Sequence, residues 1–262
     1  MVLIEHKKAS DKKINPEWLT RSYVNPIYPP LLMLSYDPED ENESIESLVE
    51  RGAGKNQAVL IDQIKAAEYH FSEGREERLL SVIDYFLKNG IDVNAKDEWG
   101  ETALMAAAYY SADIVNLLLK NGAKINDKVN GGSTALNNAC CYLNIDIVKL
   151  LLANGAVVDS ECIFDIIEQN DSLEIEDIEN QITLLQLILD NGADINEQNK
   201  KGKTALMLAI EYENKSIAEY LLQQGADVNI KDNEGGTALT YAQKNSVRIL
   251  GKLRKKMNMP LI

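Results

Sequence analysis

Apolar residues recur along this chain at helical spacing, in short segments that come in pairs. From Ala58 to Tyr69, and again from Arg78 to Leu87, apolar side chains stand three or four residues apart, which places them on one face of a helix. Four further segments are expected to be helical for the same reason: residues 162–167, 182–189, 238–244 and 247–256. The lysines and arginines of the last segment would keep one face in water, as suits a C-terminal cap. The pattern predicts a succession of helix pairs.

Two glycine motifs punctuate these segments. Gly-x-Thr-Ala-Leu, once with a second glycine in the middle, begins at Gly100, Gly132, Gly202 and Gly235. Leu-Leu-x-x-Gly-Ala, or a close variant, has its glycine at Gly122, Gly155, Gly192 and Gly225, and Gly90 belongs to the same series. From Gly90 to Gly225 the successive steps are 32, 33, 37 and 33 residues. A period near this length indicates stacked structural repeats.

With these motifs, each unit consists of a turn, a short helix, a connection, a second helix and then Gly-Ala-x-x-Asn. The chain thereby resembles the ankyrin-repeat family over residues 44–245. The resemblance implies an all-α fold, an ankyrin-repeat solenoid of about six helix-turn-helix repeats. The family's Thr-Pro-Leu-His appears as Thr102-Ala-Leu-Met and Thr204-Ala-Leu-Met, without the proline that starts the helix or the histidine that ties neighbouring turns. We expect weaker tethering between repeats as a result.

The chain divides into three parts on this interpretation. Residues 1–36 hold four prolines and many apolar residues, so we expect a non-repeat segment that caps the first repeat. Residues 37–256 form the repeat array, which opens with a degenerate repeat whose second helix is Ser44–Ala53. Residues 257–262 form a C-terminal tail.

Two repeats depart from the regular spacing. The one at 160–199 lacks Gly-x-Thr-Ala-Leu, is longer, and is expected to have an acidic connection over Asp171–Glu179 between its helices. The one near 97–128 is one residue short between Thr102 and Ile114, which predicts a tightened turn. In the regular repeats, the motif glycines are expected at positive φ. The asparagine after each Gly-Ala or Gly-Ile step is expected to hold loop backbone by hydrogen bonds.

Composition limits the environment and the chemistry. Hydrophobic residues make up 45% of the chain, no run of eighteen apolar residues occurs, and the N-terminus lacks the core of a signal peptide. The three cysteines fit neither a disulfide framework nor zinc spacing, and Cys140 occupies a helix position where other repeats have Ala108 or Ile210, so we expect it to be buried. These features predict a cytoplasmic protein.

No arrangement of residues in the sequence predicts catalysis. The two histidines, His6 and His70, stand in unrelated places, and no phosphate-binding loop or EF-hand pattern occurs. We therefore predict no enzyme activity, no cofactor and no metal.

Tyrosines in a common register are the first candidate for a binding surface. Tyr110, Tyr142 and Tyr212 each stand eight residues after a repeat threonine, and Tyr109 and Trp99 lie close to this series. The resemblance places this position at the end of the inner helix, facing the concave groove. Tyrosine and tryptophan give large contact area at small entropic cost, so we predict anchors for a partner. The alternative is that these rings only pack on their neighbours.

Negative charge is the second candidate. Of the net charge of −14, nearly all comes from one stretch: twelve acids lie between Asp159 and Glu197, with no lysine or arginine between Lys149 and Lys200. We predict that its acids contact a basic protein surface, with these four as the candidate contacts: Glu174, Glu176, Asp177 and Glu179. The alternative is a solvated acidic face. The charge disfavours nucleic acid and anionic membranes as ligands.

These observations favour a non-enzymatic module that binds another protein. A compact acidic array without an attached catalytic domain suits a stoichiometric inhibitor, or a neutralising partner such as an immunity protein that blocks a toxin. The alternative is an adaptor, or a host-directed bacterial effector, that bridges two proteins. The fold alone does not choose between them.

Overall fold

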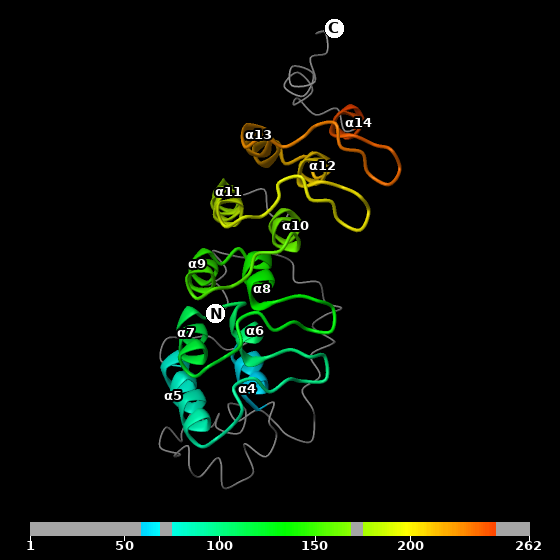
Figure 1. Cartoon of the computed structure of the whole chain (residues 1–262). Coiled ribbons are helices and arrows are strands. Elements are labelled where there is room, and N and C mark those ends of the chain that lie inside the picture. The colour runs from blue at the N-terminus through cyan, green and yellow to red at the C-terminus, as the bar shows by residue number, and fades with distance from the viewer. Residues whose placement is uncertain (1–58, 69–74, 169–174, 245–262) are drawn as a thin grey trace. The chain divides into compact units, whose positions relative to one another are not determined.

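A computed structural model of the chain describes residues 59–68, 75–168 and 175–244 (Figure 1). These residues form eleven helices: α4 (Val59–Glu68), α5 (Arg75–Lys88), α6 (Ala103–Ala107), α7 (Ala112–Lys120), α8 (Ala135–Cys141), α9 (Ile145–Ala153), α10 (Glu161–Glu168), α11 (Ile175–Asp190), α12 (Ala205–Glu211), α13 (Lys215–Gln223) and α14 (Ala238–Lys244). Over this part of the chain, the only β structure is two isolated bridges, Lys96 with Thr102 and Gln198 with Thr204. The all-α fold of paired helices is confirmed.

Several expectations concern residues outside the described ranges. They are the N-terminal cap, the opening repeat with its helix at Ser44–Ala53, the final helix over 247–256 and the tail. The chain divides into two compact units between Asn138 and Ala139, and each unit is described below by its described residues.

In the first unit, α4 packs against α5 and α6, and α7 packs against both α5 and α6. Figure 1 shows α5 and α7 in one layer and α4 and α6 in the other. The leucine and small alanine of α6 that share one helical face, Leu104 and Ala107, are fully buried, as are Ile64 of α4 and Leu118 of α7. Small residues on α6 allow neighbouring helix pairs to approach closely.

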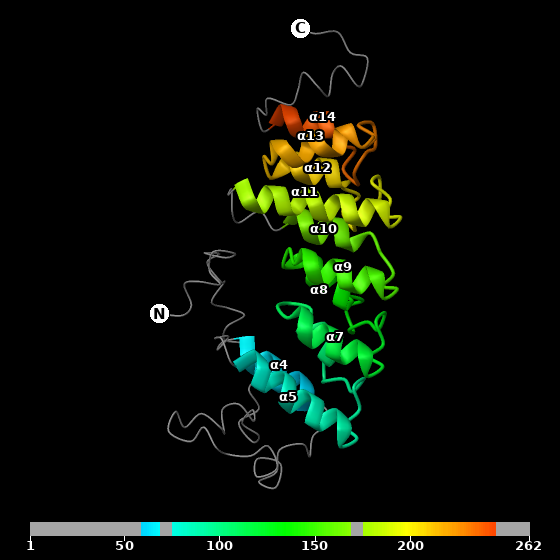
Figure 2. The same ribbon diagram turned by 90° about the vertical axis from the view of Figure 1, so that its left-hand side faces the viewer.

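In the second unit, α10 packs against α11 and α12, and α12 packs in turn against α13 and α14. The second helices of the repeats, α9, α11 and α13, contact one another in succession, and Figure 2 shows them one above the other. Leu206 and Ala209 of α12 repeat the buried pair seen in α6. Cys140 is also fully buried, as the sequence predicts.

Polar side chains fix where the helices begin. The Thr102 hydroxyl accepts a hydrogen bond from the Met105 amide at 3.3 Å, and Thr204 caps α12 in the same way. Ser111 caps α7, and Asn144 and Asn214 cap α9 and α13. Because a threonine caps the first helix, the helix begins at the expected place although the family's proline is missing.

The turn between α6 and α7 is tightened, as predicted. In the longer connections, the residue before the capping asparagine is left-handed, with φ of 55° at Leu143 and 57° at Glu213. In the shorter connection Tyr110 directly precedes the capping Ser111, and no left-handed residue occurs between the two helices. The residue missing from the shorter connection is therefore the left-handed one. The left-handed conformation costs free energy for any residue other than glycine.

Asparagines hold loop backbone by hydrogen bonds, as expected, and these bonds join successive turns. The side chain of Asn94 accepts a hydrogen bond from the Lys124 amide at 2.7 Å and donates one to the Gly122 carbonyl at 3.2 Å. Asn196 accepts one from the Asp227 amide at 2.8 Å. The motif glycines have positive φ, for example 74° at Gly202. These bonds connect neighbouring repeats in the absence of the family's histidine.

The expected start of the second helix in the divergent repeat is wrong. The sequence pattern predicted that this helix begins at Ile182, but α11 begins at Ile175 and runs for 16 residues. Residues 175–179 therefore belong to a helix and not to an acidic connection. Ile175, Ile178 and Ile182 continue the apolar spacing toward the N-terminus, and acids in a first helical turn are favoured by the helix dipole.

Candidate functional site

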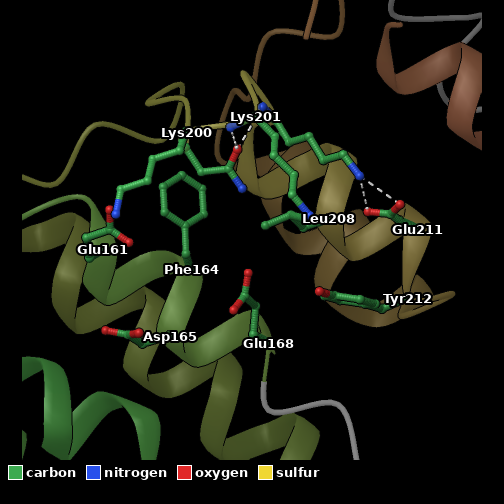
Figure 3. Close-up of a pocket in the computed structure, with 11 residues that line it drawn as sticks. Glu161, Phe164, Asp165, Glu168, Lys200, Lys201, Leu208, Glu211 and Tyr212 are labelled. Atoms are coloured by element: carbon green, nitrogen blue, oxygen red, sulfur yellow. Dashed lines mark hydrogen bonds and ion pairs between the residues drawn. The ribbon is translucent and has the colours of Figure 1, made fainter. Parts of the chain in front are cut away.

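The second unit contains a cavity of about 330 Å³ between α10 and α12. Three segments line it: α10 with Glu161, Phe164, Asp165 and Glu168, the loop before α12 with Asn199, Lys200, Lys201 and Lys203, and α12 with Leu208, Glu211 and the following Tyr212. Figure 3 shows these side chains around the cavity, with Glu161 and Lys200 toward one end and Glu168 and Tyr212 toward the other.

The acids of α10 reach the cavity because the rest of the helix is buried. Cys162, Ile163, Ile166 and Ile167 are at most 1% exposed. Glu161, Asp165 and Glu168 are at positions i, i+4 and i+7, so all three carboxylates lie on the remaining face. These three acids belong to the acidic stretch noted in the sequence, but they were not among the predicted contacts. Their helical spacing around an apolar segment was the signal that could have found them.

Glu168 continues the tyrosine series through the divergent repeat. Counted from the start of each first helix, the eighth residue is Tyr110 after α6, Tyr142 after α8 and Tyr212 after α12. In α10 the eighth residue is Glu168. In the second unit, three successive repeats therefore carry Tyr142, Glu168 and Tyr212 at this same position.

A lysine and a glutamate are already paired at the wall of the cavity. The Lys203 ammonium lies 2.7 Å from each carboxylate oxygen of Glu211 and 5.0 Å from the centre of the Tyr241 ring. Burial alone would lower the pKa of Lys203, but the hydrogen bonds to Glu211 and Tyr241 raise it overall. Lys203 therefore stays charged, and the carboxylate of Glu211 is occupied within the chain.

Tyr212 is half-buried at the edge of the cavity. Burial, and then the negative charges of Glu168 and Glu211, raise the pKa of its phenol above the ordinary value. The phenol is thus neutral near pH 7 and offers both a ring face and a hydrogen-bond donor. Of the aromatic residues predicted as partner contacts, Tyr212 is the one that lines this cavity together with acids of the divergent repeat.

In the first unit, Tyr110 and Trp99 both contact α4. The Tyr110 hydroxyl donates a hydrogen bond to the Ile64 carbonyl, and the Trp99 ring lies 5.6 Å from the Lys65 ammonium. Lys65 also pairs with Asp97 at 3.1 Å and Glu101 at 2.6 Å. Both aromatic residues thus connect neighbouring repeats. Trp99 nevertheless remains 48% exposed.

The remaining predicted contacts lie elsewhere. Tyr109 is half-buried in the turn after α6, and Tyr142 is 45% exposed after α8. Glu176, Asp177 and Glu179 lie in the first two turns of α11, and α11 contributes none of the described residues around the cavity. Glu174 lies outside the described residues.

The described residues give no sign of a metal site or a membrane span. Among them, no three His, Cys, Asp or Glu side chains are grouped so that they could hold a metal ion. No helix in the same ranges has the length and apolarity needed to cross a membrane. His6 and His70 lie outside those ranges.

The family is established by comparison with known proteins. The family model of ankyrin repeats, in three copies, matches residues 74–162 and 176–259, which is more than half of the chain. The chain belongs to the ankyrin-repeat family. A search of curated proteins gave no match. The ankyrin-repeat fold is a protein-binding fold, so the cavity lies in a scaffold suited to holding another protein.

Two solved structures resemble this ankyrin-repeat chain. One is a chain from the complex of the predatory endopeptidase Bd0816 of Bdellovibrio bacteriovorus with immunity protein Bd3460. It is 29% identical, has a TM-score of 0.58, and the match covers 75% of this chain and 96% of that one. The other is an ankyrin repeat domain from Acinetobacter baumannii AYE, 22% identical, with a TM-score of 0.60 and coverage of 78% and 100%. The second likeness concerns the fold alone.

Proposed function

We propose that this protein is a non-enzymatic binding module that holds another protein at the cavity between α10 and α12, and that it acts as a stoichiometric inhibitor of that protein. The observation that carries the proposal is the meeting of Tyr212 with the acidic face of α10 in one cavity. Tyrosines that fill or border pockets are typical of the residues that contribute most to protein interfaces. The carboxylates of α10 suit a basic surface on the partner.

The inhibitor role has support from the solved complex. That complex joins an endopeptidase to an immunity protein, and one of its chains resembles this one over most of both lengths. At 29% identity the likeness supports the class of function and not the identity of the target. We therefore propose a partner that is an enzyme or a toxin with a basic surface.

The test is a comparison of proteins retained by three forms of the tagged chain. They are the wild type, a cavity variant carrying Glu168→Gln and Tyr212→Ala, and a control variant carrying Glu77→Gln and Ser81→Ala at exposed positions of α5. We expect a protein that the wild type and the control retain at a ratio of one to one and that the cavity variant loses. If that protein is an enzyme, one equivalent of the wild-type chain should abolish its activity.

Two outcomes oppose the proposal. Equal retention of the same proteins by all three forms would show that partner binding does not use the cavity. Retention of two different proteins on one chain at the same time, with the activity of both intact, would identify an adaptor in place of an inhibitor. Circular dichroism melting of the three forms controls for loss of fold.

A further inference from the structure

The end of the cavity where α10 and α12 finish carries two carboxylates. Glu168 is the last residue of α10 and Glu211 is the last residue of α12. The C-terminal end of a helix carries partial negative charge on its last carbonyl groups and favours cations. The two helix ends and the carboxylate of Glu168 therefore favour a cation at this end of the cavity, beside the Tyr212 ring (Figure 3).

Within the part of the chain that the structure describes, a lysine pairs with one of these two carboxylates, that of Glu211. Both oxygens of Glu211 bind the Lys203 ammonium. Glu168 is exposed and borders the cavity, and its charge acts on Tyr212, since it is among the causes that raise the pKa of that phenol. Phe164, next to Glu168 on the cavity wall, is only 4% exposed and adds an apolar surface.

We propose that this end of the cavity, formed by Phe164, Glu168 and Tyr212, binds an arginine side chain of the partner protein. Arginine fits better than lysine because its planar guanidinium can stack on an aromatic ring while its N–H groups donate to a carboxylate. A volume of about 330 Å³ is sufficient for one long side chain. This inference rests on the proposed function and names the chemistry that the cavity recognises.

Two lysines at the loop side of the cavity make the charge preference testable. Lys200 and Lys201 are exposed and also line the cavity. If the guest is a cation, these ammonium groups oppose its binding, so removing one should tighten it. If the guest is a carboxylate, the same change should weaken it.

The probe is the tripeptide acetyl-Gly-Arg-Gly-amide, titrated into the isotopically labelled full chain and followed by NMR. The matched peptide has citrulline in place of arginine, which keeps the shape and removes the charge. We expect the arginine peptide to bind at about millimolar affinity, with shifts at the amides that end α10 and α12. The citrulline peptide should bind at least about tenfold more weakly, because a hydrogen bond between charged groups is lost.

Variants of the chain locate the site. Glu168→Gln should weaken binding of the arginine peptide about tenfold, Tyr212→Phe should change it little, and Lys201→Ser should tighten it a few-fold. Glu77→Gln, at an exposed position in the first turn of α5, is the matched control and should have no effect. Tyr212→Phe keeps the aromatic ring on which the guanidinium stacks. The melting temperature of each variant is measured as well, so that weaker peptide binding caused by loss of fold can be recognised.

Three results would overturn the inference: no shifts at the ends of α10 and α12, equal binding of the arginine and citrulline peptides, or weaker binding by Lys201→Ser. Any of these can occur while the cavity variant still loses its partner protein in the retention experiment. In that case the proposed function stands and the cavity recognises a different group. If the arginine peptide does not bind and the cavity variant also retains the partner protein, the cavity is not a binding site.

Discussion

Replacing Gly202 with alanine should destabilise the array more than the same change at Gly192. Both glycines are left-handed, with φ of 74° and 95°. A Cβ atom at Gly192 would meet nothing within 4 Å, whereas one at Gly202 would lie 2.5 Å from Asn233 Oδ1 and 2.7 Å from the Asn233 backbone nitrogen. Comparing the two variants therefore separates the cost of a left-handed alanine, which both share, from the cost of disturbing Asn233 in the neighbouring turn.

The magnitude follows from what Asn233 does. Its amide donates to the Lys201 carbonyl at 3.1 Å, and its side-chain nitrogen donates to the Lys200 carbonyl at 3.1 Å. An alanine in the left-handed region costs about 1–2 kcal/mol, and this applies to both variants. To admit the new methyl group Asn233 must move and lose both bonds, each worth about 1 kcal/mol. We expect losses of about 1–2 kcal/mol for Gly192→Ala and about 3–4 kcal/mol for Gly202→Ala.

The assay is urea denaturation followed by far-ultraviolet circular dichroism, with the free energy of unfolding compared between variants. Because repeat arrays can unfold in parts, the slope of each transition must also be compared. Equal losses for the two variants would refute the reasoning, since they would show that Asn233 contributes nothing to the connection between turns.

Three further predictions concern individual side chains. Tyr110→Phe should lower the free energy of unfolding by about 1 kcal/mol, because the hydrogen bond to the carbonyl in α4 is lost. The hydrogen bond from Tyr241 is the main cause that lowers the pKa of Asp232, so this carboxylate stabilises the fold above its ordinary pKa and stops doing so as the pH falls through the lowered value. In Asp232→Asn, the free energy of unfolding should therefore fall less steeply as the pH is lowered through the acidic range. The same pH dependence in the variant and the wild type would contradict this. Neutralising the acids that begin α11 should slow association with a basic partner at low salt and have little effect at high salt, as stopped-flow measurement would show.

The repeat pattern was readable from the sequence because it depends on local signals. The glycines with positive φ, the capping threonines and the buried Cys140 all follow from residue type and position within one unit. The regular period then placed most of the helices, since every repeat provides the same register.

The divergent repeat was harder to predict because its signals are not repeated elsewhere. Without Gly-x-Thr-Ala-Leu no motif marked the start of α10, so the register that puts Glu168 in line with Tyr212 was not visible. The acids at the start of α11 suggested a connection, although the isoleucines among them continue the helix. The prediction of a tyrosine series also could not anticipate that Tyr110 bonds to the preceding repeat, because that contact depends on the position of α4.

The most direct test of the central claim, that a partner protein occupies the cavity between α10 and α12, is site-specific photo-crosslinking. The photoreactive residue p-benzoylphenylalanine would replace Tyr212 at the cavity in one variant and the exposed Thr183 on α11 in another. Its side chain keeps the phenyl ring of the tyrosine and carries a photoreactive benzoyl group in place of the hydroxyl. We expect a discrete crosslinked product to one protein from position 212 and none from position 183. A product from position 183 with none from position 212 would contradict it.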